Sequence, residues 1–243
     1  MGILKKYEFT GKTKVITQSD ELGSTESHTL HQIKALKDFR DIKAGYLGGW
    51  IEKEENLSQE GDCWVYSNAM VYDDAMVYDD ALIYDYARVY GNAKVHSNAM
   101  VYGNAEVYGY TSEVYGNAEV YGSASIFSHA SIYDNAKVSD KAWVFNNAKV
   151  YGNAKVYGNA KVSDNAEVSG NAEVYNNAKV YCGAHVQATA KVYDEAKLGG
   201  FTRILNGSQV CGTSVIEGKI CVRQKNLVLK DVFLESDNGL SVF

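Results

Sequence analysis

The chain has 243 residues and a net charge of −6, with 24 Lys and Arg against 30 Asp and Glu, which disfavours broad binding to nucleic acid or to an anionic membrane. Its four cysteines form no CxxC pair, so neither a disulfide framework nor a zinc ribbon is indicated. No apolar run approaches the ~20 residues of a membrane span, and the start lacks a signal-peptide core, so we expect a soluble, cytoplasmic protein.

Residues 1–60 carry no repeat. Segments 6–10, 14–18 and 29–36 alternate like short strands, and residues 44–49 read as a glycine-rich turn. We expect a small β-rich cap over residues 1–60, because the open end of a stacked repeat exposes unpaired strand groups. The repeat itself is expected over 61–243, with degenerate last coils and a C-terminal cap at about 216–243.

From Val65 onward the sequence is a six-residue repeat, with units such as VYSNAM, VYDDAM and VYGNAK and one extra residue near Thr111. Each of the 22 hexads between Val65 and Val192 opens with Val or Ile, and 21 of them carry Ala in the fifth place. A period of six excludes a helix stripe, which needs 3.6 residues per turn. Read as a strand, A-x-V-Y places Ala and Val inside and the other two residues outside.

The two remaining places of each hexad hold Gly-Asn, Asp-Asn or similar pairs, which tolerate the left-handed backbone of a tight corner. Three sides then close into a triangular coil of 18 residues. The complete absence of proline agrees with this, because nearly every backbone N–H is needed in a ladder. The sequence therefore predicts an all-β, single-stranded parallel β-helix of about ten coils, roughly 48 Å long at ~4.8 Å per coil.

The pattern V-x-x-x-A-x resembles the hexapeptide-repeat family, and this resemblance implies left-handed coils, although left-handed crossovers are rare. Residues 29–66, TLHQIKALKDFRDIKAGYLGGWIEKEENLSQEGDCWVY, are similar to the N-terminal part of YdcK-like proteins, a family named as transferases and common in phages and prophages. The resemblance implies a phage or prophage origin and an acyltransferase as one possible activity.

Outward residues sort onto three faces when every third hexad is taken together. Each face carries a ladder of aromatic rings, which either strengthens pairing between coils or forms a stacking platform for sugars, bases or a protein. One uncharged patch on the first face is expected to be covered by the cap or by another subunit; it comprises Trp64, Tyr66, Leu82, Tyr84, Met100 and Tyr102.

The outward positions near the end of the chain also become apolar, at Val215, Leu227, Leu229 and Phe233. We expect the last residues or a second subunit to cover them. The two patches together predict a homo-oligomer, a dimer or a trimer.

Two charged groups have both a structural and a functional interpretation. A column of Lys161, Lys179 and Lys197 is either a solvated face or a match for a regularly spaced anion. Corner carboxylates favour turns, but oxygen ligands of this kind also bind divalent cations. The aspartates concerned are Asp73, Asp74, Asp79, Asp80 and Asp85.

Hexapeptide-repeat acyltransferases use an exposed histidine as general base between subunits, which makes His96, His129 and His185 weak catalytic candidates. His96 and His185 fall about five coils apart, and no inserted loop flanks them. A rod that offers similar groups in every coil suits an extended partner or its own copy better than a catalytic centre. The leading hypothesis is a non-enzymatic binding or scaffold protein without cofactor, which binds a host macromolecule or itself; the alternative is an acetyl-CoA-dependent acyltransferase.

Overall fold

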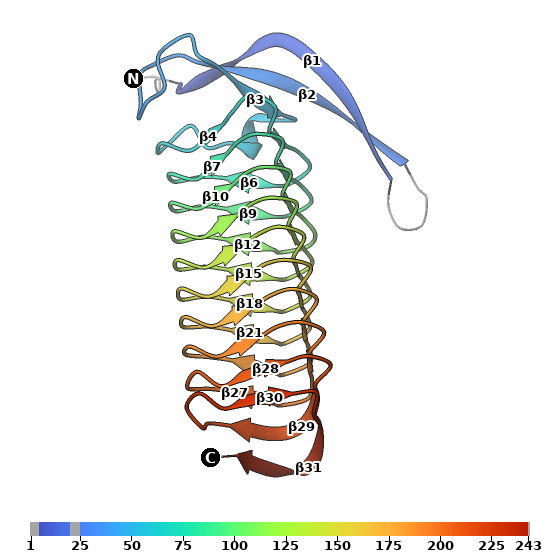
Figure 1. Cartoon of the computed structure of the whole chain (residues 1–243). Coiled ribbons are helices and arrows are strands. Elements are labelled where there is room, and N and C mark those ends of the chain that lie inside the picture. The colour runs from blue at the N-terminus through green and yellow to red at the C-terminus, as the bar shows by residue number, and fades with distance from the viewer. Residues whose placement is uncertain (1–4, 20–24, 243) are drawn as a thin grey trace.

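The computed structural model describes residues 5–19 and 25–242, and it shows a β-solenoid with a long hairpin lying across its N-terminal end (Figure 1). Strands one coil apart pair in parallel, as in Val71 with Val89, and the spacing along most of the rod is 18 residues. This confirms the predicted all-β parallel solenoid. Among the described residues there is no helix long and apolar enough to cross a membrane.

Each face of the solenoid is a parallel ladder of short strands. The first face contains β4 (Trp64–Val65), β7 (Leu82–Ile83), β10 (Met100–Val101), β13 (Glu119–Val120), β16 (Lys137–Val138), β19 (Lys155–Val156), β22 (Glu173–Val174), β25 (Lys191–Val192), β28 (Gln209–Cys211) and β30 (Val228–Lys230). The second face contains β3 (Leu47–Ile51), β5 (Met70–Val71), β8 (Arg88–Val89), β11 (Glu106–Val107), β14 (Ser125–Ile126), β17 (Trp143–Val144), β20 (Lys161–Val162), β23 (Lys179–Val180) and β26 (Lys197–Leu198). The third face contains β6 (Met76–Val77), β9 (Lys94–Val95), β12 (Glu113–Val114), β15 (Ser131–Ile132), β18 (Lys149–Val150), β21 (Glu167–Val168), β24 (His185–Val186) and β27 (Arg203–Ile204). Two long strands, β29 (Val215–Val222) and β31 (Phe233–Val242), bend from the second face onto the third.

The interior is filled by the alanine and aliphatic positions of the hexads, which are fully buried from Ala69 to Val222. The corners use left-handed backbone, with φ of 56° at Asp73 and 64° at Gly91. Both observations confirm the inside and outside positions that the hexad predicts.

Corner side chains also form hydrogen bonds to the next coil along the rod. The Asp134 carboxylate accepts the N–H of Gly152, one coil later, at 3.1 Å, and Asp140 accepts that of Gly158 at 2.9 Å. A ladder of exposed amides runs beside them and links the side chains of Asn117, Asn135, Asn153 and Asn171. Asp and Asn therefore recur at the corners both for their backbone preference and for these bonds between coils.

The N-terminal segment is a two-stranded hairpin whose strands β1 (Tyr7–Ser19) and β2 (Thr25–Ala35) pair antiparallel. The prediction of separate strands at 6–10 and 14–18 is wrong, because a bulge between Phe9 and Thr13 lets one strand continue through Gly11, whose φ is +86°. β2 pairs with β3, and Trp50 of β3 in turn pairs in parallel with Met70. Parallel stacking thus begins before the predicted boundary at residue 61.

Polar side chains close the N-terminal end of the core. The buried Lys6 ammonium donates to the carbonyl oxygens of Glu60, Gly61 and Cys63 at 3.0–3.2 Å, and burial lowers the pKa of this lysine. The side chain of Asn56, in the short 3-10 helix η1 (Glu54–Asn56), donates to the carbonyl of Ala75 at 2.8 Å. These bonds satisfy carbonyl groups that the end of a strand ladder leaves unpaired.

The C-terminal end lacks such a cover among the described residues. β31 continues the parallel ladder beside β29, so residues 216–242 extend the rod instead of folding back over it (Figure 1). The predicted register is wrong by one residue here: Leu229, expected outside, pairs with buried Val210, and Val228 pairs with Gln209 on the outside. One extra residue before β30 causes the shift. Leu227 packs partly against the core, whereas Phe233 is 70% exposed.

Candidate functional site

The aromatic ladders are runs of stacked rings along the rod, which end or break where Ser139, Ser163 and Ser169 take the outward place. Ring centroids of Tyr84 and Tyr102 are 4.8 Å apart and nearly parallel, and Tyr133 and Tyr151 repeat this arrangement at 4.9 Å on the third face. Within a ladder each ring face is therefore covered by the next ring. This favours a role in coil-to-coil packing and leaves mainly ring edges for a partner.

The first-face ladder is interrupted beside the cap. Tyr66 stands at 82° to Tyr84, with centroids 6.2 Å apart, instead of stacking on it. Two cap residues hold it there: the Tyr66 hydroxyl donates to the Asp41 carboxylate at 3.3 Å, and the ring of Tyr46 packs edge-on at 6.3 Å. Burial, reinforced by the charge of Asp41, raises the pKa of Tyr66 to about 12.

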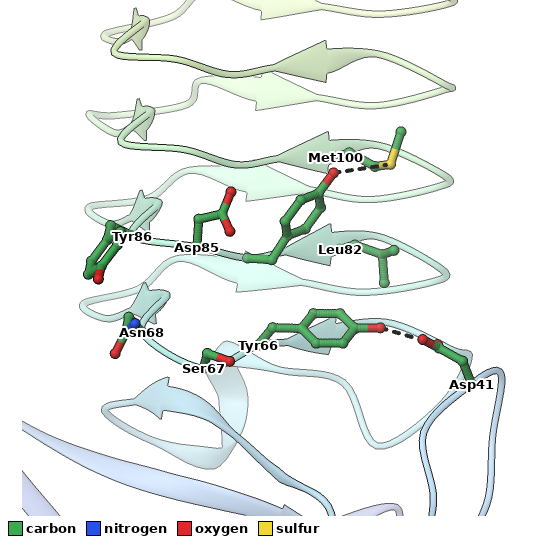
Figure 2. Close-up of a pocket in the computed structure, with 9 residues that line it drawn as sticks. Asp41, Tyr66, Ser67, Asn68, Leu82, Asp85, Tyr86 and Met100 are labelled. Atoms are coloured by element: carbon green, nitrogen blue, oxygen red, sulfur yellow. Dashed lines mark hydrogen bonds between the residues drawn. The ribbon is translucent and has the colours of Figure 1, made fainter.

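A pocket of about 520 Å³ lies beside this interruption (Figure 2). Leu82 and Met100, neighbours in the outward column of the first face, supply its apolar surface, and the hydroxyl of Tyr84 donates to the sulfur of Met100 at 3.8 Å. Corner residues complete the lining, which comprises Asp41, Tyr66, Ser67, Asn68, Leu82, Tyr84, Asp85, Tyr86 and Met100. Aromatic, apolar and acidic side chains thus meet in this pocket.

The uncharged patch of the first face is thus divided. Trp64 is fully buried beneath the cap, where Tyr7 and Phe39 pack edge-on against its ring at 6.2 Å and 5.3 Å. Leu82 and Met100 are only half-buried and line the pocket. Beyond them, the hydroxyl of Tyr102 donates to Glu119 at 3.0 Å. The sequence pattern pointed to most of the apolar lining but missed Asp41, because this residue belongs to the non-repeating cap.

The three histidine candidates lie in separate coils. His96 is stacked between Tyr78 and Tyr115 on the third-face ladder, and burial lowers its pKa. The Nδ1 atom of His185 lies 3.3 Å from a carboxylate oxygen of Glu167. The structure does not bring these two histidines together.

His129 occupies a corner, where its Nδ1 atom lies 2.7 Å from the hydroxyl oxygen of Thr111 and its ring stacks on Tyr110. Thr111 belongs to the one hexad that carries an extra residue. Ser112 takes the buried alanine place of that hexad, and its hydroxyl donates to the Tyr108 carbonyl at 2.7 Å. The insertion therefore changes one corner without forming a loop.

The basic column and the corner aspartates are placed as the register predicts. Lys161, Lys179 and Lys197 are ladder neighbours, and the Lys161 ammonium lies 4.0 Å from the centroid of the Trp143 ring. The aspartates do not form one cluster. Asp74 pairs with Lys53, Asp79 and Asp80 accept the backbone N–H groups of Ser97 and Asp62, and Asp73 faces His28.

Comparison with known proteins finds a similarity over part of the chain. No family model matches the chain. The chain is 38% identical over 63 residues to the Escherichia coli K12 protein described as "Uncharacterized acetyltransferase YdcK", and the match covers 26% of this chain and 19% of that protein. The matched region is thus less than a fifth of the relative's length. The six-residue repeat and the 18-residue parallel coils, with this partial similarity, resemble the hexapeptide-repeat family.

Proposed function

We propose that the chain is a non-enzymatic binding protein in which the solenoid is a rigid scaffold and the first-face pocket is the principal binding site. The observation that carries this proposal is the turned ring of Tyr66. It departs from the ring-on-ring packing of Tyr84, Tyr102 and Tyr121, and it does so where the cap supplies Asp41. A pocket with few, convergent polar groups on an apolar surface is typical of a recognition site.

The lining defines the chemistry of the occupant. Tyr84 and Tyr86 supply aromatic surface, Leu82 and Met100 supply apolar surface, and the carboxylate of Asp85 stands at the rim. A guanidinium group stacks on aromatic rings and pairs with carboxylates, and its stem packs on apolar side chains. We therefore infer that the partner is a protein that inserts an arginine, and the net charge of −6 favours a basic partner.

Affinity capture with matched variants tests this proposal. The immobilised full-length chain is expected to retain a partner from a lysate of its own host, and Met100→Glu is expected to lose that partner. Lys155→Glu is the control, because it places the same side chain in the same outward column, three coils farther along. Equal capture by the two variants would exclude the pocket as the binding site.

The origin of the protein is part of the proposal. The resemblance of residues 29–66 to proteins common in phages and prophages supports a phage or prophage gene. With that origin, the partner is a host macromolecule, and a component of host defence is one candidate.

We also propose that a second copy of the chain covers the C-terminal end. Val228, Phe233 and Leu240 are exposed there, and apolar side chains beside an uncovered strand edge favour association with another chain. Light scattering at micromolar concentration is expected to show a dimer that Phe233→Ser converts to monomer. A wild-type monomer would contradict this part of the proposal.

Acetyl transfer is the second candidate function, supported by the description of YdcK as an acetyltransferase. In this alternative His96 or His185 is the general base, and another subunit completes the site. Calorimetry with acetyl-CoA separates the two candidates. The binding proposal expects no saturable heat, whereas micromolar binding that is lost in one histidine variant would favour the enzyme.

A further inference from the structure

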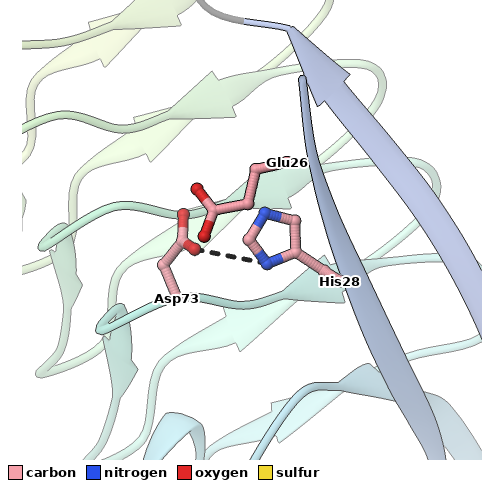
Figure 3. A group of neighbouring side chains, drawn as sticks. All are labelled: Glu26, His28 and Asp73. Atoms are coloured by element: carbon pink, nitrogen blue, oxygen red, sulfur yellow. Dashed lines mark ion pairs between the residues drawn. The ribbon is translucent and has the colours of Figure 1, made fainter. Parts of the chain in front are cut away.

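Four ionisable side chains converge where the hairpin crosses the second face. His28 of β2 is only 4% exposed and packs against the ring of Tyr72. Its Nδ1 atom lies 3.1 Å from an oxygen of Glu52 and 3.4 Å from an oxygen of Asp73. Glu26, two residues earlier on β2, turns its carboxylate towards the same point (Figure 3). Three carboxylates thus surround one imidazole.

The charge of this cluster favours a cation. Lys53, the neighbour of Glu52 in the chain, forms its ion pair with Asp74 at 2.5 Å, and Arg88 pairs with Glu106 at 3.0 Å. Even a protonated His28 leaves the cluster with an excess of negative charge. Glu26 is exposed, but Glu52 and Asp73 are partly buried, and unbalanced charge there is costly, so a bound cation would stabilise this arrangement.

The geometry suits a small divalent ion. Ligand atoms of Glu26, His28 and Asp73 all lie within 4.8 Å of one another. Atoms bound to one tetrahedral zinc ion at 2.0–2.1 Å are about 3.3 Å apart. The separations of Nδ1 from the Glu52 and Asp73 oxygens, 3.1 Å and 3.4 Å, bracket that value.

The two carboxylates nearest to the imidazole are also held in orientation. The second oxygen of Asp73 accepts the N–H of Gly91 at 3.0 Å, and the second oxygen of Glu52 accepts the N–H of Asp73 at 2.7 Å. Outer hydrogen bonds of this kind fix the direction of metal ligands. The corner residue Asp134 makes the same bond to the next coil but belongs to no cluster of metal-ligating side chains among the described residues.

We propose that Glu26, His28 and Asp73, with Glu52 beside them, bind one divalent transition ion of the zinc type. Mixed imidazole and carboxylate donors match that class of ion and not magnesium or calcium, which take oxygen ligands. The ion links the hairpin, through Glu26 and His28, to the solenoid corner at Asp73. It therefore acts as a clasp between the cap and the repeat.

Calorimetric titration of the metal-free full chain with ZnCl₂ tests the proposal. The expected result is one site of micromolar or tighter affinity, with no comparable heat from MgCl₂. Asp73→Asn is expected to weaken zinc binding at least about tenfold, because the amide oxygen still accepts the Gly91 N–H but the charged ligand is lost. Asp134→Asn, the matched corner change elsewhere, is expected to leave the affinity unchanged.

Two further measurements test whether zinc binds at this cluster and not elsewhere. His129→Ala is expected to retain the site, which excludes binding by an exposed histidine. Zinc is expected to slow amide hydrogen exchange in residues 25–35 of the wild-type protein but not in Asp73→Asn. Absence of saturable zinc binding, or equal affinity in Asp73→Asn and Asp134→Asn, would overturn the proposal and leave the contacts of His28 with Glu52 and Asp73 as the link between hairpin and coil.

Discussion

The coils beneath the hairpin and the coils of the middle of the rod are built from the same hexad, yet they differ in what surrounds it. In the middle, one contact recurs with each coil, as when Tyr133 stacks on Tyr151 and Tyr157 on Tyr175. Beneath the hairpin, the contacts do not recur from coil to coil: Lys6 donates a hydrogen bond to the carbonyl of Cys63, and His28 faces Asp73. The first-face pocket and the cluster around His28 both lie where non-repeating chain packs on the repeat.

This difference explains the position of both proposed sites. A repeat places identical side chains at a fixed spacing, so it produces ladders, whereas a binding site needs different groups at one point. The first-face pocket depends on Asp41 and the metal cluster depends on Glu26 and His28, all from the segment before the repeat. Under these proposals, the middle of the rod acts as a spacer.

The two outward tryptophans provide the sharpest test of this comparison. Trp64, under the cap, is fully buried, whereas Trp143, in the middle, is 41% exposed. Trp64→Ala is expected to lower the free energy of unfolding by about 3–5 kcal/mol, because a large cavity opens between cap and coil. Trp143→Ala is expected to cost about 1 kcal/mol or less, chiefly its contact with Lys161. Similar denaturant-unfolding curves for the two variants would remove the distinction.

Within the middle coils, an inward change should matter more than an outward one. Ala154→Leu overpacks the narrow interior and is expected to cost about 1–3 kcal/mol or more, because stacked coils cannot shift independently. Tyr157→Ser is expected to cost less, since Ser139 already occupies the equivalent outward place one coil earlier. Thermal melts compare the two, and a greater loss in the tyrosine variant would contradict the assigned packing.

Alkaline pH should weaken the ladders. Burial raises the pKa of Tyr133 and Tyr157 to about 12, above the ordinary value of 10.0. Because the unfolded chain releases these protons first, their contribution to stability is complete below pH 10 and is lost as the pH rises towards 12. Unfolding midpoints measured across this range are expected to fall. Tyr133→Phe removes one titrating group and is expected to make the fall shallower.

The smallest effect is expected in the exposed amide ladder. Asn135→Ala breaks the bonds to Asn117 and Asn153, which are 3.0 Å and 3.2 Å long. Exposed bonds of this kind contribute little net stability, so a loss of about 1 kcal/mol or less is expected in thermal melts. A larger loss would show that the amide ladder is a main source of cohesion between the middle coils.

Much of the fold was predictable because the hexad is a local rule applied again and again. The Val, the Ala and the corner residues of one hexad together specify one side of a coil. Three such sides make a coil of 18 residues, which gives the observed pairing. The prediction was wrong where the rule weakens. An extra residue before β30 moved Leu229 inside, and the bulge at Gly11 joined two predicted strands into one.

The order of the residues by itself determined the solenoid, its interior and its aromatic ladders, because these depend on periodicity and on each residue's preference for strand or corner. Only the tertiary structure decided which outward residues form sites. The cap buries Trp64, turns Tyr66 and brings Glu26 and His28 to Asp73. These contacts join residues as far apart in the sequence as Tyr7 and Trp64 without any shared pattern, so nothing in the local sequence encodes them.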